Sequence, residues 1–207
     1  MSGESEADGN PFFAHQIPRE SQKEMIADGI DALKQGGFLI AAAPTGIGKT
    51  AAALASALSV SKLYNTDPEI PKIIFLTGKQ SQHRIVVETV REINNCLPTG
   101  LSKIRLVDII GRESMCKVVD KSTGKCSCEE GVSESERKSR KASLEDFILD
   151  APVHVNRTIE LARKWKTCPW AGARGAARHT NLLVCDYNHV FVETVRDSSL
   201  PAMGIDL

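Results

Sequence analysis

The stretch that decides the fold is Ala43-Pro44-Thr45-Gly46-Ile47-Gly48-Lys49-Thr50. A small residue, four spacers and Gly-Lys-Thr make a loop whose successive backbone N–H groups can curl around phosphate oxygens, because its glycines permit the curl. We expect Lys49 to reach the β and γ phosphates of ATP and Thr50 to place its hydroxyl on Mg²⁺. Ala43 stands where the common pattern has its first glycine. The stretch predicts a phosphate-binding loop with Lys49 and Thr50 as its catalytic residues.

The segments on either side supply the context that such a loop requires. Phe38 to Ala43 is a short apolar run that predicts a strand, and Lys49 to Leu63 is rich in Ala and Leu, which predicts a helix. A helix that begins at the loop points its positive end at the bound phosphates. The strand, loop and helix in this order argue against a Gly-Lys-Thr sequence that occurs by chance.

The rest of the chain continues to alternate between strands and helices. Further strands are predicted at 72–77, 104–108 and 181–186, and further helices at 19–35 and 81–93. Strands that alternate with helices imply a parallel sheet with helices on both faces. We therefore predict an α/β fold of the P-loop NTPase class, built on a parallel sheet.

The segment at 112–178 differs in composition from the rest and is predicted to be an inserted module. It holds four of the six cysteines and a Ser/Glu/Lys-rich patch at 133–143. Short helices are predicted at 142–149 and 155–165, and the basic run at 137–141 is interpreted as a mobile, solvated loop. The predicted divisions are a polar tail at 1–15, an incomplete P-loop domain at 16–111 and 179–207, and this insertion.

The composition limits the possible classes of protein. The 26 basic residues balance the 26 acidic ones, so the overall charge does not indicate a nucleic-acid partner. The chain starts with polar and acidic residues, and no apolar run has the roughly 18 to 20 residues of a membrane-spanning helix. We predict a cytoplasmic protein without a membrane partner. In that compartment, six cysteines favour metal binding, catalysis or burial over disulfides.

The cysteines of the insertion are Cys116, Cys126, Cys128 and Cys168, with nine, one and thirty-nine residues between them. Four thiolates can hold zinc or an iron–sulfur cluster, and the spacing does not choose between the two. Cysteine is also a common buried residue, so four separate core thiols are a third interpretation. Cys185 lies in an apolar run and is expected in the core, whereas the role of Cys96 stays open.

These motifs together resemble one family of nucleic-acid motors. Residues 43–50 are similar to motif I of superfamily 2 helicases, especially the branch of the xeroderma pigmentosum group D (XPD) helicase. Residues 111–116 and 168–174 resemble the flanks of the first and last cluster cysteines in that branch, and 186–188 resembles the segment that follows its cluster domain. The resemblance implies a RecA-like motor domain and a [4Fe–4S] cluster. Its implied ligands are Cys116, Cys126, Cys128 and Cys168, although the middle pair has one intervening residue where much of the family has two.

The resemblance also implies where nucleotide and DNA bind. Arg19 and Gln22 resemble a helix that lies near the nucleotide base, and an exposed helix face is the plainer alternative. Residues 75–82 look like motif Ia, which implies contacts from Thr77, Gln80 and Ser81 to the DNA backbone. A helix start suits phosphate contact without sequence readout, and helix capping would explain Ser81 as well.

A local basic surface is predicted between residues 157 and 178. Six basic residues stand there against one acid, with Trp165 and Trp170 among them. Charge can follow phosphates while indole rings stack on bases, so we expect this region to contact single-stranded DNA. The expected contact residues on this side are Arg112, Trp170 and Arg174. A solvated helix face with two core tryptophans is the alternative.

The expected function is the amino-terminal part of an ATP-dependent 5′→3′ DNA helicase acting on single-stranded or forked DNA, as the resemblance implies. The Asp-Glu-Ala-His motif of that family is absent from these residues, and its second motor domain is expected in the full-length chain. We expect the 207 residues alone to lack turnover. Two alternatives stay open, which are a small P-loop kinase or transferase and a zinc-containing nucleic-acid adaptor.

Overall fold

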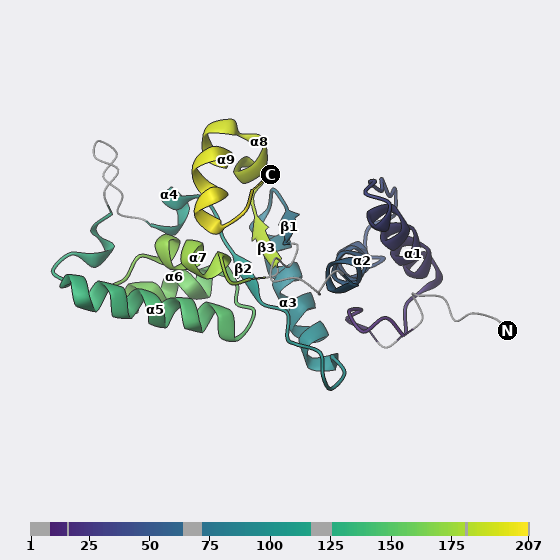
Figure 1. The fold of residues 1–207 in the computed structure, drawn as a ribbon, viewed down its shortest axis with the longest axis horizontal. Coiled ribbons are helices and arrows are strands. Elements are labelled where there is room, and N and C mark those ends of the chain that lie inside the picture. The colour runs from purple at the N-terminus through teal and green to yellow at the C-terminus, as the bar shows by residue number, and fades with distance from the viewer. Residues whose placement is uncertain (1–8, 16, 64–71, 117–125, 181, 207) are drawn as a thin grey trace. The chain divides into compact units, whose positions relative to one another are not determined.

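The computed structural model describes residues 9–15, 17–63, 72–116, 126–180 and 182–206 (Figure 1). Most of the predicted polar tail, and Asn181 of the last predicted strand, lie outside the described residues. The chain divides into two compact units. The first comprises Met1–Ile73 with Glu88–Lys103, and the second comprises Ile74–Val87 with Ile104–Leu207. The division falls within the helix α3 (Gln80–Cys96).

In the first unit, helices α1 (Glu20–Lys34) and α2 (Lys49–Leu63) pack against each other. Both confirm the helices predicted there. Ile26 and Ile30 of α1 are buried in one cluster with alanines of α2. A Cβ at Gly29 would lie 2.6 Å from the Ser56 Oγ, so glycine allows the two helices to approach closely here. Ser56 Oγ also donates to the carbonyl of Ile26 at 3.2 Å, which satisfies a buried polar group within this contact.

The strand predicted at 38–43 is not formed, and this prediction was wrong for the described structure. These residues have no regular secondary structure. Phe38 is 87% exposed and Ile40 is 86% exposed. An apolar run becomes a strand only when a neighbouring strand pairs with its backbone N–H and C=O groups, and the segment has no such pairing here.

The second unit contains the sheet, in which β3 (Leu182–Cys185) lies between β1 (Ile73–Leu76) and β2 (Leu106–Asp108) (Figure 1). β2 and β3 run parallel, with Leu106 opposite Leu182. Every residue of these two strands is buried, as expected for a parallel sheet that is covered on both faces. The predicted α/β fold with a parallel sheet is therefore confirmed, and three predicted strands are present with slightly shorter bounds.

The cysteine-rich segment folds into helices around an apolar core. They are α4 (Arg112–Met115), the 3₁₀ turn η1 (Ser127–Glu129), α5 (Glu134–Asp150), α6 (Val155–Lys164) and α7 (Pro169–Ala177). Leu144 and Ile148 of α5 are buried with Ala173 and Ala176 of α7. A Cβ at Gly172 would lie 2.6 Å from the Leu144 side chain, so glycine lets α7 approach α5.

The basic run at 137–141 lies inside α5, so its interpretation as a solvated loop was wrong. Ser133 and Glu136 form a capping box that starts the helix upstream of the run. Ion pairs one turn apart then add a small further stabilisation. These pairs are Lys138–Glu134, Arg140–Glu136 and Lys141–Glu145. The basic residues are solvated as expected, but on a regular helix.

The chain continues after β3 through α8 (Asn188–Phe191), α9 (Glu193–Ser199) and the 3₁₀ turn η2 (Pro201–Met203). Leu200 and Met203 reach the core that α5 and α7 share with the sheet. Among the described residues, none of the helices is both long and apolar enough to span a membrane.

Candidate nucleotide, cysteine and nucleic-acid sites

The phosphate loop lies in the first unit and has the backbone that its glycines allow. Gly46 and Gly48 have φ values of +83° and +82°, in the left-handed region. Lys49 Nζ donates to the carbonyls of Ala43 at 2.8 Å and Pro44 at 2.7 Å, so the ammonium group folds over the loop. Thr50 follows in the first turn of α2. The predicted loop residues are therefore brought together around the start of that helix.

Helix α1 supports this loop through the two residues predicted to lie near the nucleotide base. Gln22 is buried, and its Nε2 donates to the carbonyl of Ile47 at 2.8 Å. Arg19 Nη1 lies 3.5 Å from the carbonyl of Gly46. A Cβ at Gly48 would collide with the Gln22 amide. Arg19 and Gln22 thus contact the loop backbone itself, which places α1 and the loop in one site.

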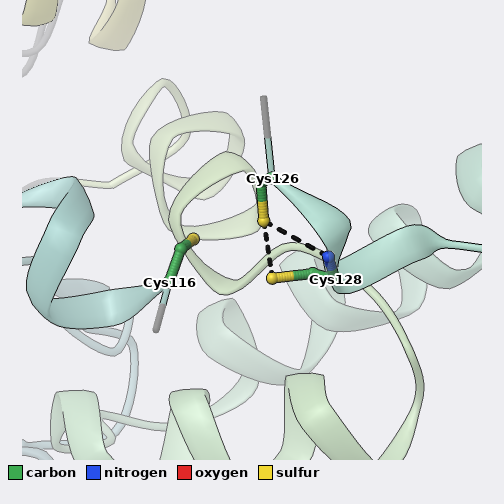
Figure 2. A group of neighbouring side chains, drawn as sticks. All are labelled: Cys116, Cys126 and Cys128. Carbon is green, nitrogen blue, oxygen red and sulfur yellow. Dashed lines mark hydrogen bonds between the residues drawn. The ribbon is translucent and has the colours of Figure 1, made fainter. Parts of the chain in front are cut away.

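The four cysteines of the predicted cluster site converge in the second unit. Cys116 ends α4, Cys126 and Cys128 flank the start of η1, and Cys168 caps α7. The Sγ atoms of Cys116, Cys126 and Cys128 lie within 4.8 Å of one another (Figure 2). Cys168 Sγ lies 3.6 Å from Cys116 Sγ. All six cysteines are free, and Cys96 and Cys185 lie outside this group.

The close approach of the thiols shifts their pKa values in opposite directions. A hydrogen bond with Cys116 lowers the pKa of Cys168 to about 6, and the same contact raises the pKa of Cys116. Burial and the neighbouring Cys126 raise the pKa of Cys128 to about 12. Backbone N–H groups donate to two of the sulfurs, from Cys128 to Cys126 and from Ala171 to Cys168. Four converging sulfurs with N–H donors fit a thiolate-bound metal group.

The predicted DNA-contact residues of the module form one stack beside this site. The Arg174 guanidinium lies 4.3 Å from the Trp170 ring centroid, and that of Arg112 lies 5.2 Å from it. Burial, followed by the charges of Arg178 and Arg112, lowers the pKa of Arg174. Trp165 instead packs edge-on against Phe147, with 6.3 Å between the ring centroids. Both tryptophans are half-buried and pack against the same core, and Trp170 is the one with two guanidinium groups near its ring.

The predicted backbone-contact residues follow β1 in the second unit. Thr77 is buried, and its Oγ1 accepts from the Lys79 N–H at 3.3 Å and donates to the Gln82 side chain. Gln80 and Ser81 are exposed in the first turn of α3. Thr77 therefore shapes the turn from within, whereas Gln80 and Ser81 present polar groups to solvent.

A pocket of about 550 Å³ opens beside Gln80. Its apolar wall is formed by Ile110 and Ile159, and the polar groups around it come from α3, α4 and α6. These polar residues are Gln80, Ser114, Asn156, Glu160 and Arg163. Sequence reasoning missed Ser114 and Asn156, because isolated polar residues on two helices carry no spacing signal.

Sequence reasoning also missed a cluster of ionisable side chains around His83, a buried residue in the first turns of α3. His83 lies between Asp108, at the end of β2, and Asp186, which follows β3. Only the position of the two acids at the carboxyl ends of neighbouring strands could have indicated it. In the sequence, Asp186 begins the segment that resembles the XPD branch, and its place at the end of an apolar run also makes it a candidate metal-binding acid.

The comparisons with known proteins agree with this arrangement. A parallel α/β sheet and a phosphate loop define the class as a P-loop NTPase, and a family model described as DEAD_2 matches residues 61–204. That is well over half of the chain, so the chain belongs to the DEAD_2 family. No curated protein matches the chain significantly.

One solved structure that the chain resembles is named "XPD_Helicase". The TM-score is 0.58 at 17% sequence identity, which shows a shared fold. The match covers 93% of this chain and 31% of that chain, so the chain spans less than a third of the length of the protein it resembles. Together with the family match, this confirms the predicted resemblance to the XPD branch.

Proposed function

We propose that the chain is the nucleotide-binding and DNA-contacting part of an ATP-dependent 5′→3′ DNA helicase that carries a [4Fe–4S] cluster. The observation that carries this proposal is the convergence of four cysteines from positions up to 52 residues apart, in a chain of the DEAD_2 family. Cysteines that were buried only for packing would be expected at scattered positions in the core. Cys185, which is as buried as Cys116, lies outside the group.

ATP and Mg²⁺ are assigned to the loop at 43–50. The left-handed glycines give the loop the curled backbone that a phosphate site needs, and the dipole of α2, which starts at Lys49, would favour an anion there. Lys49 would leave the carbonyls of Ala43 and Pro44 for the β and γ phosphates, since a charge-assisted bond to phosphate is stronger than one to a neutral carbonyl. Thr50 would place its hydroxyl on Mg²⁺.

The cluster is assigned to Cys116, Cys126, Cys128 and Cys168 within an insertion at 112–178. Bound there, it would cross-link segments that otherwise pack together only through the apolar core. Cys116 would tie α4 to the module, and Cys168 would tie the start of α7 to η1. The same cross-links would hold Arg112 of α4 and Trp170 of α7 in their stack.

Single-stranded DNA is assigned to the surface between the first turn of α3 and the Trp170 stack. Gln80 lines the pocket from one side, and Ser114, two residues after Arg112, lines it from the other. Arg163 adds a cation, whereas Glu160 is paired with Arg157 at 2.8 Å. Polar groups that line a pocket with an apolar wall suit a nucleotide held without sequence readout.

The chemical step is assigned to residues beyond these 207. The acids that hold Mg²⁺ and orient water, and the arginine that meets transition-state charge, have no candidate motif in this sequence. We therefore expect the chain alone to bind ATP and single-stranded DNA without DNA-stimulated hydrolysis. Phosphate release should equal a no-enzyme control with and without DNA, and turnover that disappears in Lys49→Ala would contradict this assignment.

The test of the proposal is iron and sulfide analysis of anaerobically purified protein, combined with titration of fluorescent ATP and single-stranded DNA. The proposal requires iron and sulfide in a near 1:1 ratio, visible absorbance and binding of both ligands. Zinc in place of iron would favour a nucleic-acid adaptor. Nucleotide binding with neither metal nor DNA affinity would favour a small kinase or transferase.

A further inference from the structure

His83 is fully buried, and both of its ring nitrogens face a carboxylate. Nδ1 lies 2.5 Å from Oδ1 of Asp108, and Nε2 lies 3.5 Å from Oδ1 of Asp186. Asp108 is buried, whereas the side chain of Asp186 is 33% exposed. A neutral imidazole has one N–H and could satisfy only one carboxylate. Among the described residues Nε2 makes no hydrogen bond, so Asp186 acts on the ring as a nearby charge, and two carboxylates around one ring suit its imidazolium form.

The Asp108 carboxylate joins this histidine to helix α6. Its Oδ2 accepts the backbone N–H of Val155, the first residue of α6, at 2.8 Å. His154, the N-cap of α6, lies close by, with Nε2 at 3.9 Å from the same Oδ2 and 3.4 Å from the carbonyl of Gln80. One carboxylate at the end of β2 thus connects the starts of two helices, α3 through His83 and α6 through its backbone.

The charges around His83 favour its protonated form. Burial lowers the pKa of His83, but the hydrogen bond and charge of Asp108 together with Asp186 raise it by more, so the net shift is upward. His189 of α8 also faces the cluster, and burial lowers its pKa, so it adds little positive charge. Burial also keeps the neighbouring Cys185 thiol neutral, because it raises the pKa of that thiol to about 12.

A buried cluster of charged groups contributes little net stability to a core. A buried ion pair is often no more stable than apolar residues of the same volume, because desolvation offsets much of the attraction. A hydrogen bond differs from an apolar contact because it is directional and therefore restricts how the two groups are oriented. The cluster holds the first turn of α3 in one orientation relative to β2 and α6. That turn carries Gln80 and Ser81, and Gln80 also lines the pocket.

We propose that His83 is a positioning residue for nucleic-acid binding: the Asp108–His83–Asp186 bridge fixes the first turn of α3, so it sets the affinity of Gln80, Ser81 and the adjoining pocket for single-stranded DNA. The inference rests on the proposed function, because it needs DNA to bind at this turn. His83 itself, being buried, touches no DNA.

The test measures single-stranded DNA affinity of the anaerobically purified 207-residue chain from about pH 6 to about pH 9 at constant ionic strength. Affinity of the wild type should fall as the pH passes the raised pKa of His83. His83→Gln should bind about tenfold more weakly at the acid end and lose this dependence, because glutamine cannot carry the charge. His179→Gln is the matched control, since His179 is exposed and outside the cluster, and it should follow the wild type.

Asp186→Asn separates positioning from a merely structural effect. It removes the partly exposed carboxylate and leaves the His83–Asp108 contact, so the protein should fold with its iron content intact. The midpoint of the pH profile should move to lower pH, and an NMR titration of the His83 ring should move with it. Identical profiles in wild type and Asp186→Asn, or equal affinity in His83→Gln, would overturn the inference. Absence of DNA binding by the wild type at every pH would instead overturn the proposed function, and the inference with it.

Discussion

The phosphate loop and the cysteine site are built in opposite ways. The loop is eight consecutive residues, and its own glycines and lysine give it its shape. The contact from outside the loop comes from Gln22 of the preceding helix, α1. The cysteine site has no such continuity, since its first and last members are 52 residues apart and three separate elements carry its sulfurs. A contiguous site is encoded by local conformation, whereas a discontinuous one exists only when the surrounding helices pack. The two should therefore fail differently when single residues are changed.

The largest effect is expected at the cysteine site. Cys168→Ser should abolish iron binding and loosen α5 to α7, because a small segment that uses a metal as a cross-link depends on it for order. Iron analysis and limited proteolysis would measure both effects, while ATP affinity should be unchanged because the loop lies in the other unit.

Cys96→Ser is the matched control for that change, because Cys96 is an exposed free cysteine outside the group. It should keep a full complement of iron and the wild-type proteolysis pattern. A fully iron-loaded Cys168→Ser protein would remove Cys168 from the ligand set.

The next effect is expected at Lys49. Lys49→Ala should weaken ATP binding by more than tenfold, because a hydrogen bond from a charged group is worth about 1.5–3 kcal/mol. Titration with a fluorescent ATP analogue would measure it, and iron content should not change. Lys34→Ala, which removes an exposed lysine at the end of α1, should bind ATP like the wild type. Equal affinities in both variants would exclude Lys49 from the site.

Two glycines in the first unit, Gly48 and Gly36, test whether the Gln22 contact helps to shape the phosphate loop. Gly48 and Gly36 both have positive φ, and alanine in that region costs about 1–2 kcal/mol. A Cβ at Gly48 would also collide with Gln22, whereas a Cβ at Gly36 meets nothing within 4 Å. Gly48→Ala should therefore lose ATP affinity and Gly36→Ala should lose only stability. Similar ATP affinity in the two variants would show that the Gln22 contact does not shape the loop.

The smallest effect is expected in the pH dependence of stability in the second unit. The folded pKa of His83 lies above its unfolded value, so the bridge contributes its full stability below the unfolded pKa of about 6.5. This contribution is lost as the pH rises through the raised folded pKa. Urea unfolding at a series of pH values should show that decline in the wild type, and His83→Gln should lack it. A decline of the same size in His83→Gln would assign the pH dependence to another group.

Sequence reasoning succeeded where chemistry and spacing are local. The helices at α1, α2 and α6, three strands of the sheet and the clustering of Cys116, Cys126 and Cys128 were predicted from periodicity, composition or motif. It was wrong about the strand at 38–43, because pairing needs a neighbour that an apolar run does not specify. It was also wrong about the loop at 137–141, because a capping box at Ser133 outweighs the repulsion of clustered basic residues.

The sequence by itself determined the phosphate loop, the class of fold and the identity of the thiols, since each depends on residue types at short or regular spacing. Only the tertiary structure decided that Cys116 meets Cys168, that Trp165 packs against Phe147 while Trp170 lies beside two arginines, and that His83 lies between two carboxylates. Those contacts join residues far apart in the chain. Their distances depend on how helices pack against the sheet, and no spacing in the sequence records that.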